Sequence, residues 1–194
     1  MRNSTCLSYS CIAIVGVGLA LGATCSSTGI TPSPGNGSTP TMALESTAFT
    51  NGSPIQVLYT QDGGNLSPPL EWFDVPAGTQ ELAIIMEDTD TGPVFFVHWV
   101  IYKIPATLTG LPVGLPTNVT LTNPQGVLQG LNSGFGSGYF GPDPPAGGTH
   151  HYRFTLYALD ATLNVAAGLD AAALRAYMQG HILATAELIG TFSH

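Results

Sequence analysis

The sequence predicts a mainly β fold of antiparallel strands, with one or two helices late in the chain. Charged residues make up only 8% of the 194 residues, whereas Gly and Pro number 24 and 15, a composition that favours strands and loops over charged surface helices. From Met42 onward, apolar segments rich in β-branched and aromatic residues recur between turn signals. Helix signals start only at Asp170.

Four apolar segments have the length and composition of strands. They are residues 55–59, 81–86, 95–102 and 152–159. Glycine allows positive φ and proline fixes φ, so the stretches rich in these residues are predicted to be loops. These stretches are residues 62–65, 67–69, 76–78 and 141–148, together with a long glycine-rich stretch over 134–141. Loops of that length in a compact domain are often functional.

Two short helices are predicted near the end of the chain. Asp170 can cap a helix over residues 171–179, and Gly180 separates it from a second run over 181–188. No repeat with a period of about 20–50 residues is visible. The length of 194 residues fits one sizeable domain once a leader is removed.

The start of the chain predicts export. Arg2 is followed by an apolar run over residues 11–23, close to the ~7–15 residues of a signal-peptide centre and short of the ~20 that cross a bilayer. We therefore predict a signal peptide over 1–25, a flexible Ser/Thr/Pro/Gly linker over 26–41 and a folded domain over 42–194. The expected location is the periplasm, the cell envelope or the exterior.

Cys25 could carry a lipid anchor. Residues 21–25 resemble a bacterial lipobox, although Thr24 stands where Gly, Ala or Ser is usual. Lipidation of Cys25 and cleavage by the ordinary signal peptidase both stay open. Because Cys6 and Cys11 lie in the predicted leader, no internal disulfide and no cysteine-built metal site is expected in the mature chain.

The charge balance excludes some partners. The formal net charge is −8 and no run of Lys or Arg occurs, whereas nucleic acids and anionic membranes are bound by basic patches. We expect no nucleic-acid partner, and a membrane contact only through a lipid anchor.

The first group of residues suited to chemistry is a carboxylate cluster. Glu87, Asp88 and Asp90 directly follow the predicted strand 81–86. Such a cluster can bind a cation, orient a histidine or act as an acid–base pair. It can equally be an ordinary solvated turn.

His98 is the second candidate. Strand alternation predicts that it shares a face with Phe96 and Val100. It can therefore be either a neutral core histidine or a pocket residue.

The third candidate is the pair His150 and Tyr152. Neighbours on a strand face opposite ways, so these two share a face and His151 points away. They would offer hydrogen-bond donors to a small anion, or else simply decorate the surface. The histidines have no tight metal-binding spacing, and there is no nucleophile motif or P-loop lysine, so no metal, cofactor or enzymatic activity is predicted.

In chain order, these motifs resemble the signature of the phosphatidylethanolamine-binding protein (PEBP) family. The resemblance rests on residues 87–90, 97–100 and 141–152. It extends from Met42 to the end of the chain, and the segments 65–72 and 180–191 are similar to the bacterial Raf kinase inhibitor-like branch.

The resemblance implies a β-sandwich with a pocket for phosphate, phosphoethanolamine, acetate or a similar small anion. The ligand-binding residues that it implies are Asp88, His98, His150 and Tyr152, with Pro144 and Pro145 as the loop wall. Two positions depart from the family pattern. Thr89 replaces the proline of D-P-D, and His151 replaces the arginine of H-R-Y.

The leading hypothesis is therefore an exported PEBP-like binding or regulatory protein with a pocket for a small anionic group. Binding should strengthen as the pH falls through the ordinary histidine pKa, about 6.5. An alternative is an inhibitor that contacts an envelope or secreted protease through a loop within 134–148. A hydrolase using Asp88 and the two histidines as acid and base is the third and least favoured hypothesis.

Overall fold

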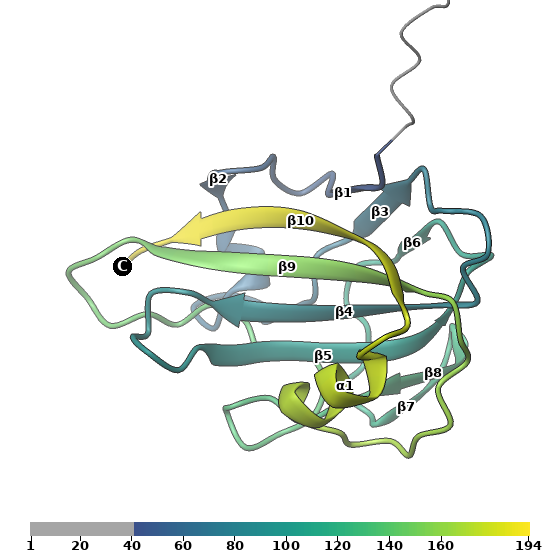
Figure 1. Ribbon diagram of the computed structural model, residues 1–194. Coiled ribbons are helices and arrows are strands. Elements are labelled where there is room, and N and C mark those ends of the chain that lie inside the picture. Colours follow the sequence, from purple (N-terminus) through teal and green to yellow (C-terminus); the bar gives the residue numbers. More distant parts are fainter. Residues whose placement is uncertain (1–40) are drawn as a thin grey trace, which may run out of the picture. The chain divides into compact units, whose positions relative to one another are not determined.

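The computed structural model describes residues 41–194, which form ten strands, one α-helix and one short 3-10 helix (Figure 1). The predicted signal peptide, Cys25 and nearly all of the predicted linker lie outside the described residues. No helix within residues 41–194 is both long and apolar enough to span a membrane.

The elements follow one another along the chain with few helical interruptions. They are β1 (Ala43–Glu45), β2 (Ser53–Pro54), η1 (Val57–Tyr59), β3 (Leu70–Phe73), β4 (Glu81–Asp88), β5 (Phe96–Pro105), β6 (Gly110–Leu111), β7 (Thr120–Thr122), β8 (Gln125–Gln129), β9 (His150–Leu159), α1 (Ala171–Met178) and β10 (Ile182–Phe192).

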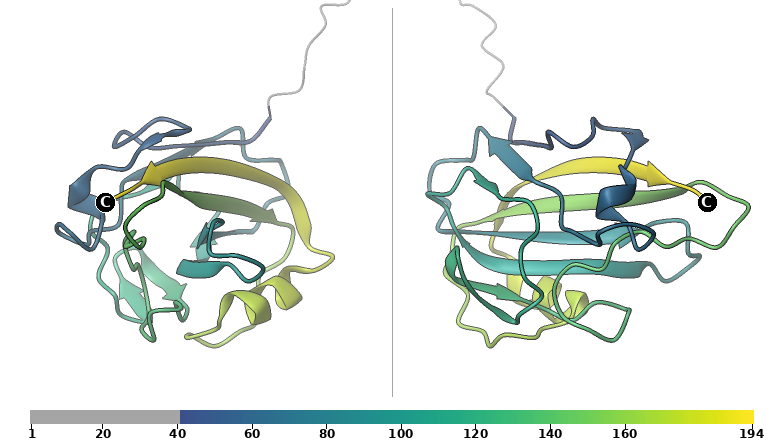
Figure 2. Two further views of the ribbon diagram at one scale, coloured as in Figure 1. Left: turned by 90° about the vertical axis from the view of Figure 1, so that its left-hand side faces the viewer. Right: turned by 180° about the vertical axis from the view of Figure 1, so that it is seen from behind.

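The strands form two sheets. The large sheet has the order β2-β10-β9-β4-β5-β8-β7, and the small sheet has the order β1-β3-β6. All neighbouring strands run antiparallel except β10 and β2, which are parallel. The small sheet lies on one side of the large sheet and α1 on the other (Figures 1 and 2). The predicted mainly β, antiparallel sandwich is confirmed.

The central strand β4 packs against both the small sheet and α1. All eight of its residues are buried. Leu82, Ile84 and Met86 pack into the cluster that includes Trp72 of the small sheet. The intervening Ala83 and Ile85 pack into a second cluster with the α1 residues Leu174 and Met178. Because both faces of β4 are covered, its side chains do not alternate between polar and apolar, which explains its continuous apolar run.

The predicted strand over residues 55–59 is wrong. Pairing with β10 stops at β2, and the chain then forms the 3-10 turn η1. Ile55 and Tyr59 are buried while Val57 and Leu58 are exposed. The buried positions are thus four residues apart, which suits a helical turn better than a strand.

The first predicted helix is confirmed and the second is wrong. Asp170 caps α1 by accepting a hydrogen bond of 2.7 Å from the Ala173 N–H. Gly180 then takes a φ of +83°, and residues 182–192 form β10 instead of a helix. β10 pairs with β9 along its whole length and buries alternate side chains toward its end. This tertiary pairing overrides the helix propensity of a short Ala- and Leu-containing run.

Candidate functional site

A pocket lies where three adjacent strands of the large sheet bring polar residues together. Asp88 ends β4, His98 lies near the start of β5, and His150 begins β9. These side chains line a cavity of about 370 Å³. Its walls also include Phe96, Phe140, Asp143, Pro144 and Pro145. The structure therefore gathers five of the six predicted ligand-binding residues around one cavity, with Tyr152 buried beside it.

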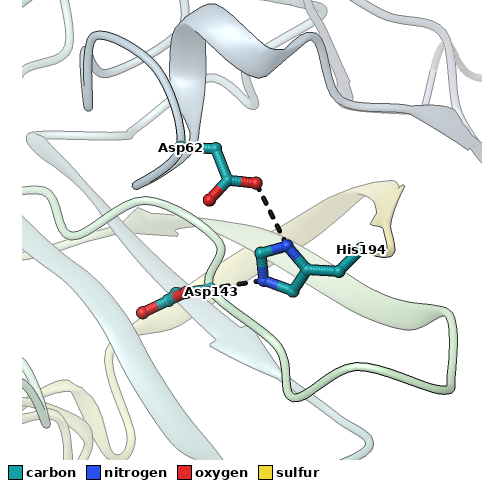
Figure 3. Close-up of side chains that lie close together, drawn as sticks. All are labelled: Asp62, Asp143 and His194. Carbon is teal, nitrogen blue, oxygen red and sulfur yellow. Dashed lines mark ion pairs between the residues drawn. The ribbon is translucent and has the colours of Figure 1, made fainter.

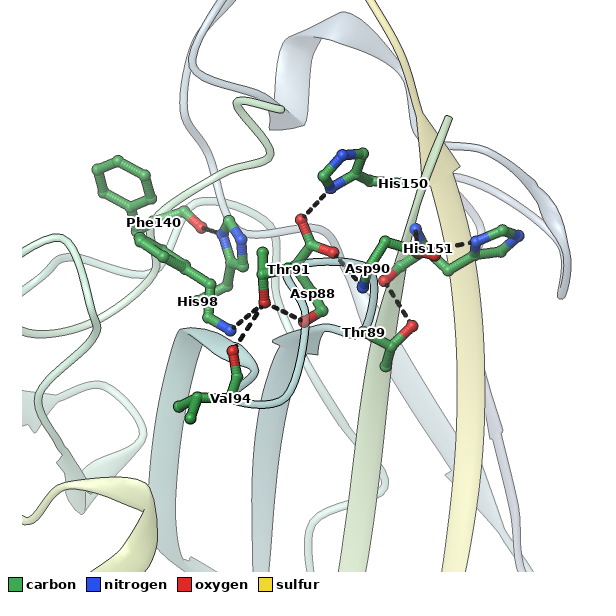
Figure 4. Close-up of polar contacts among 10 residues, drawn as sticks. Asp88, Thr89, Asp90, Thr91, Val94, His98, Phe140, His150 and His151 are labelled. Atoms are coloured by element: carbon green, nitrogen blue, oxygen red, sulfur yellow. Dashed lines mark hydrogen bonds and ion pairs between the residues drawn. The ribbon is translucent and has the colours of Figure 1, made fainter. Parts of the chain in front are cut away.

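Asp88 holds His150 in a fixed orientation. The Nδ1 atom of His150 lies 2.6 Å from Oδ2 of Asp88 (Figure 4). The other carboxylate oxygen of Asp88 accepts a hydrogen bond of 2.8 Å from the Asp90 N–H. Asp88 is only 3% exposed, so this charge-assisted pair is poorly screened by water. Of the roles open to this carboxylate, the geometry fits that of orienting a histidine.

His98 is held in the neutral form. Its Nδ1 lies 2.7 Å from the Phe140 carbonyl oxygen, which can only accept, so Nδ1 carries the hydrogen (Figure 4). Burial lowers the pKa of His98, although the Phe140 carbonyl and the charge of Asp88 act in the opposite direction. Near neutral pH, Nε2 of His98 is therefore a hydrogen-bond acceptor.

A β-bulge places His98 in the pocket. The β4–β5 ladder pairs Met86 with Trp99 and Glu87 with Val97, which leaves His98 as an extra residue. Phe96 shares the pocket face with His98, as predicted. The predicted partner Val100 does not, because it packs into the cluster beneath α1. Strict alternation would have turned His98 toward that helix.

Tyr152 lies opposite Asp88 in the β4–β9 ladder and is fully buried. Its ring packs edge-on against that of His98, with 5.1 Å between centroids. Within residues 41–194 its hydroxyl has no hydrogen-bond partner. The nearby Asp88 carboxylate acts on this hydroxyl, but the two groups do not meet hydrogen-bond geometry. Burial, followed by the charges of Asp88 and Asp143, raises the pKa of Tyr152, so the hydroxyl stays protonated.

His151 and Asp90 form an exposed pair outside the pocket. The Asp90 carboxylate accepts the His151 N–H at 2.7 Å, and the His151 ring nitrogen lies 2.9 Å from the same oxygen. Burial raises the pKa of Asp90, but these hydrogen bonds and the nearby histidine charges outweigh it and leave that pKa lowered. The predicted opposite facing of His150 and His151 is confirmed. Thr89, at the family's proline position, donates its N–H to the His151 carbonyl at 3.0 Å, a bond that proline could not make.

Glu87 belongs to the other face of the sheet. Its buried carboxylate lies 2.7 Å from Arg175 of α1 and 3.4 Å from Arg153. The three carboxylates between residues 87 and 90 therefore have three separate surroundings, and of these three only Asp88 lines the pocket.

Some pocket residues were not predicted. The Phe140 carbonyl fixes His98, and Asp143 lies in the pocket wall between prolines. The proline-rich composition predicted the loop but gave no sign of which of its polar side chains would line the cavity. Asp143 also belongs to a cluster with Asp62 and His194, whose ligand-type atoms all lie within 4.8 Å of one another (Figure 3).

Sequence comparison assigns the chain to a known family. Residues 45–193 match the model of the phosphatidylethanolamine-binding protein family. The chain belongs to that family, which confirms the resemblance seen in its motifs.

Relatives occur in archaea and bacteria. A UPF0098 protein of Methanothermobacter thermautotrophicus is 42% identical over 151 residues, covering 78% of this chain and 98% of the relative. A Mycobacterium tuberculosis protein whose name, LppC, describes it as a lipoprotein is 38% identical over 152 residues, covering 78% and 72%.

Two solved structures share the fold. The PEBP homologue CT736 of Chlamydia trachomatis has a TM-score of 0.71 at 36% identity, covering 79% of this chain and 98% of its own. Escherichia coli YbcL, described as a member of the mammalian PEBP family, has a TM-score of 0.73 at 30% identity, covering 80% and 99%.

Proposed function

We propose that this PEBP-family protein is an exported binding protein whose pocket holds a small anionic group, such as phosphate or a phosphoethanolamine-like group. The observation that carries the proposal is the Asp88–His150 pair at 2.6 Å, on the wall of the cavity. With Nδ1 directed at Asp88, the ring of His150 can donate a second hydrogen bond only from Nε2 of the imidazolium. Anion binding therefore needs this ring to be protonated.

The remaining polar groups suit an oxyanion that still carries a proton. His98 offers an acceptor, and Tyr152 supplies a buried hydroxyl with no other partner among the described residues. The pocket lining includes two carboxylates, Asp88 and Asp143, and neither Lys nor Arg. A fully ionised ligand would be repelled more strongly than a partly protonated one. This charge balance supports binding that strengthens as the pH falls.

The proposal is tested by titrating inorganic phosphate and O-phosphoethanolamine into the protein at mildly acidic pH, with NMR detection. Asp88→Asn and His150→Gln should abolish saturable shifts at the pocket, whereas His151→Gln is the matched control because His151 lies outside the pocket. Affinity that stays constant from mildly acidic to mildly alkaline pH would contradict the protonation requirement. Saturable shifts that survive in both pocket variants would place the site elsewhere.

Export is supported by the apolar run near the start of the chain and by the lipoprotein name of the relative LppC. The protein is proposed to be exported and then either anchored through a lipid on Cys25 or cleaved by the ordinary signal peptidase. Mass spectrometry of the mature protein checks it: a diacylglyceryl mass on Cys25 supports the anchor, and an unmodified new N-terminus near residue 25 supports ordinary cleavage. An intact Met1 end in exported material would contradict both routes.

A second candidate function is inhibition of an envelope or secreted protease by direct contact. Phe135, at the pocket mouth, is fully exposed and has a φ of +65°, which is unfavourable for a residue other than glycine. A large exposed aromatic group in a constrained loop suits contact with a partner protein. Phe135→Ser should then abolish inhibition in a protease assay, and inhibition equal to that of the wild type would contradict this candidate function.

We propose no catalysis for this pocket. The two hydroxyl groups that line it, those of Thr91 and Ser133, are bonded to backbone groups. Neither forms a hydrogen bond with His98 or His150, so no activated nucleophile is formed among the described residues. Hydrolysis of simple phosphate esters that disappears in His98→Ala would overturn this view.

A further inference from the structure

A histidine beyond the last strand bridges two loops at the pocket. His194 follows β10, and its Nδ1 lies 3.1 Å from Oδ2 of Asp62 while its Nε2 lies 3.5 Å from Oδ1 of Asp143 (Figure 3). Asp62 lies in the loop after η1, and Asp143 lies in the loop that walls the pocket. Three segments far apart in the sequence therefore meet at one imidazole ring.

This geometry fits the charged form of the ring. A neutral imidazole has one N–H, so its other nitrogen would present a lone pair to a carboxylate. The imidazolium has an N–H on both nitrogens and attracts both carboxylates through its charge; the two contacts are ion pairs and not hydrogen bonds. The ring also packs edge-on against Phe192, at 5.7 Å between centroids. Among residues 41–194, Asp62 and Asp143 are the groups that form ion pairs with the ring.

A metal ion explains the arrangement less well. Asp62, Asp143 and His194 could supply three ligand atoms, and all are solvent-exposed. A metal ion, however, binds one nitrogen of an imidazole and draws the other ligands to that side. Here the two carboxylates lie at different ring nitrogens. A proton on the imidazole ring therefore explains the arrangement more simply than a bound metal ion does.

We propose that His194 is a proton-dependent latch on the pocket wall. When protonated, it ties the Asp143 loop to the Asp62 loop and offsets the negative charge of Asp143 at the pocket. When it loses the proton, one of the two bridges is lost and Asp143 again repels an anionic ligand. The effect on the ligand rests on the proposed anion-binding function, whereas the effect on the two loops does not.

The two loops contain amides that report on the latch. The Gln61 N–H donates to the Pro142 carbonyl at 3.0 Å, and the Gly141 N–H donates to Oδ1 of Asn65 at 2.8 Å. Both hydrogen bonds join the loops that His194 bridges. A change in the relative position of the loops should alter the chemical shifts of both amides.

The first experiment is a pH titration by NMR of the wild type, His194→Gln and His181→Gln. His181 is the matched control because it forms an exposed 2.9 Å pair with Asp160, which lies after the opposite end of β9 from the pocket. In the wild type, the Gln61 and Gly141 amide shifts should follow the midpoint of the His194 ring. That component should vanish in His194→Gln and persist in His181→Gln. Amide shifts unchanged in His194→Gln, or following the His150 ring alone, would overturn the latch.

The second experiment measures phosphate affinity below and above the His194 midpoint. An exposed ion pair contributes about 0.2–1 kcal/mol, so His194→Gln should weaken binding by up to about fivefold at the lower pH and leave it unchanged at the higher pH. Equal affinities for wild type and variant at both pH values would remove the link to the ligand.

The two experiments separate the failure of the latch from that of the proposed function. If phosphate does not bind at all, the anion-binding function fails, and the amide titration still decides whether the latch exists. Amide coupling that is lost with EDTA and restored by Zn²⁺ would assign the bridge to a metal and overturn the proton latch.

Discussion

Replacing Tyr152 by phenylalanine should raise the stability of the protein and lower its affinity for phosphate. The hydroxyl is buried and has no hydrogen-bond partner among residues 41–194. An unsatisfied buried polar group costs about 1–3 kcal/mol, so its removal should stabilise the free protein by about 1 kcal/mol if a water molecule offsets part of that cost. The melting temperature should then rise by about 2–4 °C for a domain of roughly 150–250 residues.

The affinity should change in the opposite direction. A hydrogen bond to a charged group is worth about 1.5–3 kcal/mol, so Tyr152→Phe should weaken phosphate binding about 10- to 100-fold if the hydroxyl donates to the ligand. Calorimetric titration measures the affinity, and thermal unfolding without phosphate measures the stability.

Tyr139→Phe is the matched control. Tyr139 is also buried, but its hydroxyl donates to the Tyr59 carbonyl at 2.8 Å. Its replacement leaves that carbonyl without its donor and should destabilise the protein by about 1 kcal/mol while leaving phosphate affinity unchanged. If Tyr152→Phe destabilises the protein as much as Tyr139→Phe does, the Tyr152 hydroxyl has a partner and the reasoning is wrong. Unchanged phosphate affinity in Tyr152→Phe would show that the ligand does not use it.

Three further predictions concern stability, each measured by urea unfolding. Burial lowers the pKa of His98, so the unfolded chain takes up its proton first: the contribution of His98 is complete above pH of about 6.5 and is lost as the pH falls toward the lowered pKa. Stability should therefore fall from pH 7 to pH 5 more in the wild type than in His98→Gln, and equal slopes would refute the assignment. Leu174→Ala should cost about 2–5 kcal/mol because Leu174 is fully buried beneath β4, and a loss below ~1 kcal/mol would mean that α1 packs loosely. Gly130→Ala should also be destabilising, because a Cβ there would clash with the Leu169 carbonyl oxygen. Gly147→Ala is the comparison: a Cβ there meets no other atom, so only the strain of a φ of +109° should destabilise it.

The strands that carry the pocket could be predicted because the composition of each segment favours a strand. β4, β5 and β9 are rich in β-branched and aromatic residues, and turn signals separate them. The opposite facing of His150 and His151 follows from strand alternation, and the helix cap at Asp170 follows from its side chain. These features need only neighbouring residues, so the sequence contains the information.

Features that depend on distant segments could not be predicted in the same way. β10 is a strand because β9 offers it a full-length partner, although its own residues resemble a short helix. The bulge at His98 depends on how β5 pairs with β4. The bridge from Asp62 through His194 to Asp143 joins three segments that no local pattern relates.

The bulge in β5 divides the strand into a part that walls the pocket and a part that packs in the protein interior. Because His98 is the extra residue, it and the next residue, Trp99, both face inward. Trp99 and the residues after it anchor β5 to the hydrophobic interior, while Phe96 and His98 belong to the pocket. A change at Phe96 can thus reshape the pocket wall alone, whereas a change at His98 also reaches the buried Tyr152 ring. The bulge therefore leaves one aromatic position of β5 free to vary at the pocket wall while the rest of the strand keeps its packing.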